Sequence, residues 1–185
     1  MPAAPPGTRW LYSTGETNLV GTLVQQATGK PLATYLAEKV WGPAGMEHDA
    51  TWLVSKTGQE VGGCCIQASP RDYAHMGLFI LNGAKVDGQS IVPDGWWEAA
   101  TTKQADIGRP GHGYGYQWWT NDDGSYAARG IFGQGIFIDP QRELVIVTNA
   151  NWAGGARDPA AMKAREQFYR EVQQAVDAEQ QRSKD

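Results

Sequence analysis

The chain has 185 residues, and its 16 Lys and Arg against 20 Asp and Glu give a net charge of −4. Because no run of basic residues exceeds two, the sequence excludes a Lys/Arg-rich face and therefore nucleic acid as the main partner. No apolar run approaches the ~18 residues of a membrane span, and the first residues lack the basic start and apolar stretch of a signal peptide. We therefore expect a cytoplasmic protein that makes no contact with a membrane.

Neither the cysteines nor the histidines predict a cofactor. Cys64 and Cys65 are neighbours, which seldom reach relaxed disulfide geometry, so we expect two reduced thiols. His48, His75 and His112 are scattered without the spacing of metal ligands. The sequence therefore predicts neither a metal nor a cofactor.

The first half of the chain reads as helices and loops. Apolar residues recur at helical spacing after Thr14, the expected N-cap, and Gly29 ends this first helix. A proline at the first turn opens the second helix, and Ser69 followed by Pro70 opens the third. The predicted elements are a helix over 14–28, a helix over 31–40, a loop over 46–63 and a helix from 70 to about 81.

The second half reads as a sheet followed by a helix. The Asp-Asp-Gly run at 122–124 is a strong hairpin signal, and consecutive strands joined by tight turns are antiparallel. The predicted elements are a turn or hairpin over 85–92, a short helix over 93–101, strands at 116–119, 125–130, 134–139 and 143–149, and a helix over 159–178.

Helices followed by an antiparallel meander predict an α+β fold with helices packed on the sheet. We expect one domain over 1–178 and a polar tail over 179–185. A sheet of three or four strands is small, so further strands could come from residues before Met1.

The most informative motif is the run GTRWLYSTG at 7–15. Further runs support it: NLVG at 18–21, TGKPL at 28–32 and ASPRDYA at 68–74. Together they resemble the β-lactamase-like serine hydrolases, which include class C β-lactamases, penicillin-binding peptidases and related esterases. The sequence of these motifs is most similar to that of the 6-aminohexanoate-dimer hydrolases, over about residues 5–178. This resemblance implies an incomplete domain of that fold.

The resemblance assigns a catalytic role to Tyr12. A serine hydroxyl is a weak nucleophile unless a partner accepts its proton, and in this family a lysine and the motif tyrosine share that task. Thr14 stands where the family usually has asparagine, so a role carried by an amide there is in doubt. The alternative is that Tyr12 is a partly buried structural aromatic.

The family's nucleophile lies in a Ser-x-x-Lys motif, which places hydroxyl and amine on one face of a helix. None of the six serines has lysine three positions later; they are Ser13, Ser55, Ser69, Ser90, Ser125 and Ser183. We therefore expect the nucleophile to lie in a missing N-terminal half, which would be a partner of this chain.

The family's third motif is Lys/His-Thr-Gly on a strand, where the N–H after the glycine contributes to the oxyanion hole. Lys56-Thr57-Gly58 has the letters but lies in a loop too early in the chain. The better match is the run 128–130, in which Gly130 takes the glycine position and Ile131 would supply the N–H. Ala128 replaces the cation, which favours amide or ester substrates over β-lactams.

Four more residues are candidates for substrate binding, each with a structural alternative. Trp118 and Trp119 could wall the cleft or pack in the core. His112 lies in a Gly-rich loop that could contact substrate. Asp158 could bind an amine of the substrate or cap the last helix.

The leading hypothesis is part of a serine hydrolase that cleaves small-molecule amides or esters through an acyl-enzyme, with this chain inactive alone. One alternative is a catalytically inactive, penicillin-recognising-type binding module. Another is a β-lactamase or carboxylesterase of the same superfamily, and a third is a poorly folded fragment. Fold resemblance does not choose among these substrates.

Overall fold

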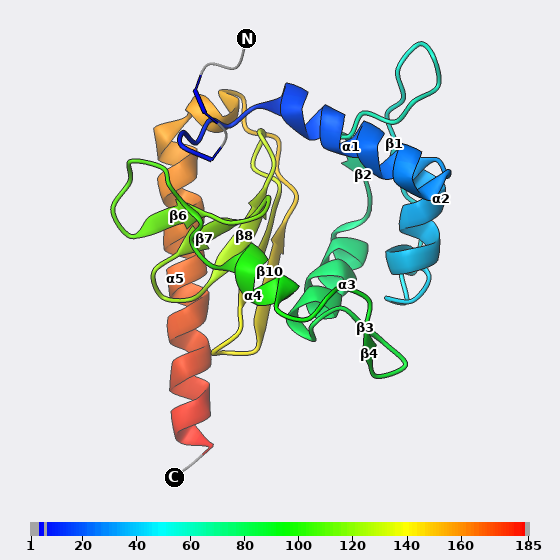
Figure 1. Cartoon of the computed structure of the whole chain (residues 1–185). Coiled ribbons are helices and arrows are strands. Elements are labelled where there is room, and N and C mark those ends of the chain that lie inside the picture. Colours follow the sequence, from blue (N-terminus) through cyan, green and yellow to red (C-terminus); the bar gives the residue numbers. More distant parts are fainter. Residues whose placement is uncertain (1–3, 6, 184–185) are drawn as a thin grey trace. The chain divides into compact units, whose positions relative to one another are not determined.

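The computed structural model describes residues 4–5 and 7–183 (Figure 1). It divides into two compact units, Met1–Met76 and Gly77–Asp185, and the boundary falls inside helix α3 (Pro70–Leu81). Each unit is described by itself below. The expectation of one domain over 1–178 stays a prediction.

Unit 1 is built from helices and one short strand pair. Its elements are α1 (Thr14–Thr28), α2 (Leu32–Leu36), the π-helix η1 (Ala37–Trp41), β1 (Thr51–Trp52), β2 (Ile66–Gln67) and the first turns of α3. The first helix has the predicted span, but its N-cap is Ser13, whose Oγ accepts the Glu16 N–H at 3.4 Å. Gly29 ends it in the left-handed conformation, φ 67°, and its N–H donates to the Gln25 carbonyl.

Two predictions for unit 1 need correction. The helix predicted over 31–40 changes to a π turn, in which the Gly42 N–H donates to the carbonyl of Ala37 five residues back. The segment predicted as a loop contains β1, which pairs antiparallel with β2, and a bridge between Val54 and Glu60. A two-residue strand is too short to show an alternating pattern in the sequence.

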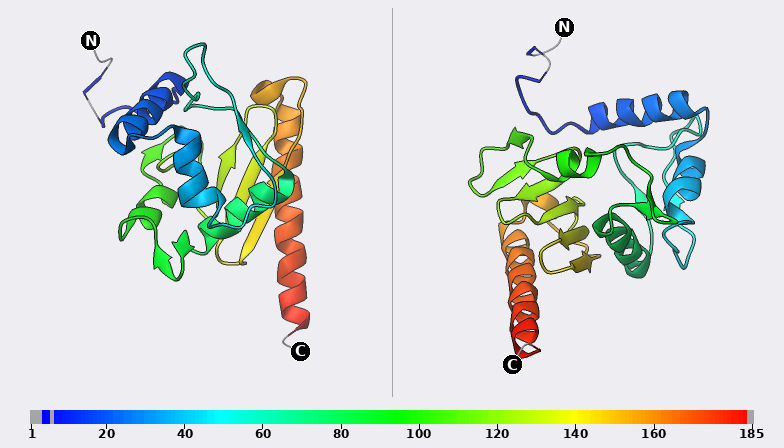
Figure 2. Two further views of the ribbon diagram at one scale, coloured as in Figure 1. Left: turned by 90° about the vertical axis from the view of Figure 1, so that its right-hand side faces the viewer. Right: turned by 60° about the horizontal axis from the view of Figure 1, so that its bottom comes forward.

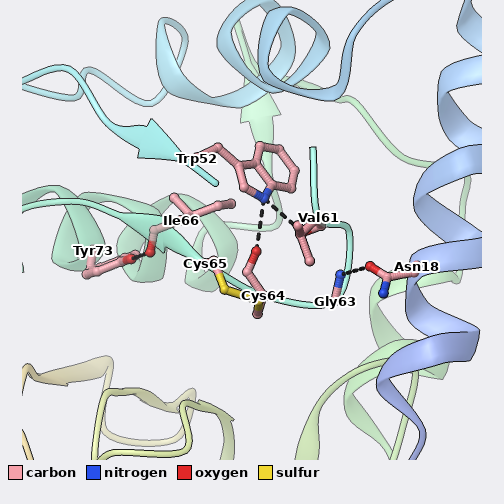
Figure 3. The surroundings of a disulfide bond; sticks show 8 residues. All are labelled: Asn18, Trp52, Val61, Gly63, Cys64, Cys65, Ile66 and Tyr73. Carbon is pink, nitrogen blue, oxygen red and sulfur yellow. Dashed lines mark hydrogen bonds between the residues drawn. A yellow bond between two sulfur atoms is a disulfide. The ribbon is translucent and has the colours of Figure 1, made fainter. Parts of the chain in front are cut away.

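The prediction of reduced thiols was wrong, because Cys64 and Cys65 form a disulfide (Figure 3). Their Cα atoms are 3.7 Å apart, and Cys65 has a φ of 80°, in the left-handed region that non-glycine residues seldom occupy. The prediction rested on the two cysteines being neighbours in the sequence. A sharp backbone turn at Cys65 nevertheless brings their two sulfur atoms together.

The disulfide turn is joined to the rest of unit 1 by hydrogen bonds on both sides (Figure 3). Trp52 Nε1 donates to the Cys64 carbonyl at 2.9 Å, and the Gly63 N–H donates to Asn18 Oδ1 of α1 at 2.9 Å. A β-carbon at Gly63 would lie 2.6 Å from Thr14 Cγ2, so this turn packs closely against the first turns of α1. The turn therefore supports the helix that follows Tyr12.

Unit 2 is a six-stranded antiparallel sheet in the order β10-β9-β8-β7-β6-β5, accompanied by helices. The strands of this sheet are β5 (Ala105–Asp106), β6 (His112–Tyr114), β7 (Trp119–Asn121), β8 (Tyr126–Arg129), β9 (Gly135–Asp139) and β10 (Leu144–Thr148). A separate antiparallel pair is formed by β3 (Lys85–Val86) and β4 (Gln89–Ser90). The helices of unit 2 are the end of α3, α4 (Trp96–Thr101), the short 3-10 turn η2 (Gly155–Arg157) and α5 (Pro159–Arg182). The predicted α+β class with an antiparallel sheet is confirmed.

The sheet has more strands than predicted. β6 lies in the Gly-rich loop that contains His112, β5 lies just before it where no element was predicted, and the strand predicted at 116–119 begins only at Trp119. The displacement has a local cause, since Gln117 adopts a φ of 67° that breaks the extended chain. The hairpin at 122–124 is confirmed, with Gly124 at φ 84°.

The strand register separates two faces of the sheet. Ala127, Phe137 and Ile146 lie opposite one another and pack against Tyr169 of α5, whose ring stacks on Phe137 at 4.6 Å. We call this side the α5 face, and Figure 2 shows α5 running along it. Ala128, one position later, points to the opposite face. In the part of the chain that the structure describes, no helix is both long and apolar enough to cross a bilayer.

Candidate functional site

The segment 130–134 connects β8 to β9, and we call it the oxyanion turn. Gly130 N–H donates to the Gln134 carbonyl at 2.8 Å, and Phe132 N–H donates to Gln134 Oε1 at 3.0 Å. Ile131 is 63% exposed, and its N–H makes no hydrogen bond to any described residue. The Ile131 N–H is therefore a backbone donor without a partner among the described residues, at the position predicted from the sequence.

Two side chains that the sequence analysis missed support this turn. Gln134 Nε2 donates to the Ala150 carbonyl at 3.1 Å, so the side-chain amide of Gln134 connects this turn to the segment around Ala150. Trp152 N–H donates to the Phe132 carbonyl at 2.9 Å, and a β-carbon at Gly133 would lie 2.4 Å from the Trp152 ring. Only glycine fits there, and its φ is 94°. Gly130 and Gly133, three positions apart, were the signal for this turn in the sequence. The contact between Gly133 and Trp152 could not be predicted from it.

No cation replaces the lysine or histidine that the family motif has at position 128. Arg129 is the nearest candidate in sequence, but its guanidinium lies 5.9 Å from the centre of the Trp119 ring. Trp119 pairs with Ala127, so both side chains lie on the α5 face, opposite Ala128. The strand register therefore prevents Arg129 from taking the place of the missing cation.

The two tryptophans predicted to wall a cleft lie on opposite faces of β7. Trp118 packs edge-to-face on Tyr126 at 5.3 Å, on the side of Ala128. Trp119 packs edge-to-face on Tyr114 at 4.9 Å, on the α5 face. Burial raises the pKa of Tyr126 to about 12, so its hydroxyl stays protonated. Of the two, only Trp118 shares a face with Ala128.

His112 and Asp158 each have hydrogen-bond partners of their own in the structure. His112 lies on β6, and its Nδ1 is 2.8 Å from Asn121 Oδ1 on the neighbouring strand. Asp158 is the N-cap of α5 and accepts the N–H groups of Ala160 and Ala161, both at 3.0 Å. These contacts give each residue a structural task, and their substrate-binding roles stay predictions.

Tyr12 belongs to unit 1, whereas the other predicted site residues belong to unit 2. It lies just before the N-cap of α1, its ring centre is 6.4 Å from that of Trp10, and it is 55% exposed. The apolar side chains that follow it are also exposed. The exposed members of this group, which we call the α1 stripe, are Leu11, Tyr12, Leu19, Val20 and Leu23.

All six serine hydroxyls make short-range hydrogen bonds. Their partners are the Glu16 N–H for Ser13, Thr57 for Ser55, Asp72 for Ser69, Val92 for Ser90, Asp123 for Ser125 and Glu179 for Ser183. None of these bonds is to a lysine, tyrosine or histidine. Within the described chain, no serine therefore has the lysine or tyrosine partner that the family's nucleophile has.

The comparisons with known proteins agree with the motifs. Residues 1–170 match the family described as Beta-lactamase. The chain is 28% identical over 152 residues to the 6-aminohexanoate-dimer hydrolase of Paenarthrobacter ureafaciens, covering 76% of this chain and 39% of that protein. It also resembles a solved structure from Bacillus anthracis, provisionally named a 6-aminohexanoate-dimer hydrolase, with a TM-score of 0.81 and 28% identity.

That structural match covers 95% of this chain and 46% of the Bacillus protein. The chain thus spans less than half the length of either relative. The family match, in contrast, extends over both units and includes Tyr12 and the oxyanion turn. The chain therefore belongs to the Beta-lactamase family of hydrolases.

Proposed function

We propose that this chain is the C-terminal portion of a serine hydrolase that cleaves small linear amides or esters through an acyl-enzyme. The observation that carries the proposal is the exposed residue Ile131, whose N–H has no partner among the described residues, on a turn fixed by Gln134 and Trp152. Such a preorganised donor stabilises the oxyanion that develops when a nucleophile attacks a carbonyl. A segment outside these 185 residues supplies the Ser-x-x-Lys pair.

In the proposed reaction the serine oxygen attacks the substrate carbonyl and its proton passes to the lysine and Tyr12. The negative charge on the carbonyl oxygen is stabilised by the Ile131 N–H. Tyr12 then donates a proton to the leaving amine or alcohol, and water hydrolyses the acyl-enzyme. Tyr12 and Ile131 thus have separate tasks, one in proton transfer and one in charge stabilisation.

The absence of a cation at Ala128 supports the choice of substrate. A β-lactam carries a carboxylate that the family's strand lysine or histidine helps to bind, and Arg129 faces the other way. The linear dimer named in both relatives carries its carboxylate at the far end of an aliphatic chain, whereas a β-lactam carries it next to the ring nitrogen, so the linear amide does not need a cation at this strand position. The substrate of a carboxylesterase does not need this cation either, so the proposal includes esters as well as amides.

The α1 stripe supports the proposal of a missing segment. Exposed apolar residues that gather on a surface often mark an interaction site, and Leu19, Val20 and Leu23 of α1 are exposed. A segment that covered this stripe would also lie near the tyrosine.

The first test reads the coding DNA upstream of Met1. An in-frame helix with Ser-x-x-Lys is expected, and a stop codon directly before Met1 would contradict the proposal. In that case the alternative is a catalytically inactive binding module, which the local bonding of all six serines favours. Fluorophosphonate labelling gives a second test: the 185-residue chain alone should stay unlabelled.

The residue roles are tested in the joined protein with 6-aminohexanoate dimer and a short ester. Tyr12→Phe should lower kcat strongly while the fold is kept, with Tyr35→Phe on α2 as the matched control. Ile131→Pro removes the N–H and should lower kcat by about 10²–10³, the usual loss of one oxyanion donor. Ile131→Ala keeps the N–H, so equal losses for both Ile131 variants would remove the assigned role.

A further inference from the structure

A pocket of about 380 Å³ lies on the α5 face, between the end of the sheet and the first turns of α5. Its wall is mostly apolar. The residues that matter here are Ala150, Trp152, Ala161, Ala164, Arg165 and Phe168. Small-molecule sites have this size and this character, an apolar wall with a few polar groups.

The polar group in this wall is Arg165. The residue is only 8% exposed, and its Nε and Nη1 are buried with no hydrogen-bond partner among the described residues. Its guanidinium lies over the Trp152 ring, 4.8 Å from the centre. The ring face offsets part of the charge but accepts no hydrogen bond at these nitrogens in the structure. A buried guanidinium in this state normally has an anionic partner.

Neighbouring charges do not provide that partner. Glu166 is adjacent on α5, but both of its oxygens accept hydrogen bonds from Arg109 Nη2, at 2.9 and 3.0 Å. Arg129 on β8 adds a second buried guanidinium whose Nε is also unpaired within the described chain. Burial lowers the pKa of Arg165 and of Arg129, and the charge of Arg165 lowers that of Arg129 further. The cluster thus contains three cations and one carboxylate.

We propose that this pocket binds a small aliphatic carboxylate. The carboxylate would lie against the Arg165 guanidinium, which lines the pocket and whose charge it would neutralise. The aliphatic chain would lie against Trp152, Phe168 and the alanines of α5. No acidic residue lines this pocket, so an amino group at the far end of the ligand would form no ion pair there. A monocarboxylate without an amino group is therefore the favoured ligand. The proposal does not depend on the catalytic function proposed above.

Hexanoate is the probe, titrated into the 185-residue chain by isothermal calorimetry, with hexylamine as the cationic counterpart. Saturable binding is expected for hexanoate and none for hexylamine. Arg165→Gln should weaken hexanoate by about tenfold or more, the usual effect of losing a charge-assisted pair. Lys163→Gln removes an exposed positive charge from the same helix and should change nothing.

Ala164→Phe tests the contacts of the ligand's aliphatic chain separately from the charge of Arg165, because the new ring fills the pocket and leaves Arg165 in place. It should also weaken hexanoate. If Arg165→Gln lowers the melting temperature too far to be titrated, Arg165→Lys and Ala164→Phe carry the test. The proposal is overturned by equal binding of hexylamine, by no saturable hexanoate binding, or by unchanged affinity in the Arg165 and Ala164 variants.

Discussion

The two units of this chain bury different kinds of side chain. In unit 2, Ala127, Phe137 and Ile146 meet Tyr169 of α5 in a closed apolar cluster. Among the described residues of unit 1, Leu32 is the only buried hydrophobic side chain. Unit 2 therefore has the core that an independent fold requires.

The segments of unit 1 are instead connected by hydrogen bonds to buried carboxylates. Asp72 is fully buried and accepts hydrogen bonds from the backbone N–H groups of Glu47 and His48 and from the Ser69 hydroxyl. Glu60 is also buried, and it accepts the N–H of Ala33. At the same time the α1 stripe is left exposed. Unit 1 thus has its polar anchors in place while the α1 stripe is exposed among the described residues, and in our proposal the nucleophile segment covers this stripe.

The largest expected effect breaks the core of unit 2. Phe137→Ala removes a ring that stacks on Tyr169 and should lower the free energy of unfolding by about 3–5 kcal/mol. Hydrogen exchange of the β8–β10 amides measures the loss within that unit. Phe168→Ala is the control, because this ring is 45% exposed and its removal should cost far less. Equal losses would mean that the apolar cluster is not the core of unit 2.

The next effect breaks an anchor of unit 1. The Ser69 hydroxyl bond, with the two backbone N–H groups and His48, lowers the pKa of Asp72 below its ordinary value. A carboxyl with a lower pKa in the folded state stabilises the fold above its unfolded pKa, and this stability is lost as the pH falls through the folded pKa. Unit 1 should therefore lose protection in hydrogen exchange below about pH 4.

Asp72→Asn tests the assignment. The variant should be less protected than the natural chain at pH 7, and its protection should change less between pH 7 and acid. Other carboxyls with lowered pKa, Glu47 and Asp177 among them, contribute to the acid response of both proteins. The difference between the two pH profiles thus isolates Asp72. Parallel profiles would show that Asp72 is not the titrating anchor.

A smaller effect sharpens the account of the disulfide turn in unit 1. Cys65 has a φ of 80°, a conformation that costs a non-glycine residue about 1 kcal/mol. In a Cys64→Ser background, which removes the disulfide, Cys65→Gly should therefore be more stable than Cys65→Ser by about that amount. Urea unfolding of the two double variants gives the comparison. A more stable serine variant would imply that the turn opens when the disulfide is absent.

The sequence predicted most where local chemistry decides the outcome. The span of α1, the hairpin at 122–124 and the helix beginning at Pro159 follow from caps, glycines and apolar spacing. The position of Ile131 on a strand-to-strand turn was also predicted, from its resemblance to a family motif. These features depend on residues close in the chain.

What could not be predicted depends on residues far apart. Gln134 and Trp152 support the oxyanion turn through contacts with the Ala150 and Phe132 carbonyls, which no spacing rule identifies. The disulfide depends on one positive φ at Cys65, and the late start of β7 depends on the bend at Gln117. In each case the three-dimensional path of the backbone decides which side chains meet.

The smallest expected change in stability concerns the α1 stripe, and it bears most directly on the contrast between the units. Leu19 and Leu23 are 69% and 66% exposed, so Leu19→Gln with Leu23→Gln should change the free energy of unfolding of the chain by less than about 0.5 kcal/mol per site. The same pair should abolish assembly with the Ser-x-x-Lys segment, measured by analytical ultracentrifugation of the two pieces. Gln26→Ala, an exposed polar position of the same helix, should leave assembly intact. If the double variant instead unfolds unit 1, the stripe already belongs to the core of this unit, and its exposure no longer argues for a missing partner.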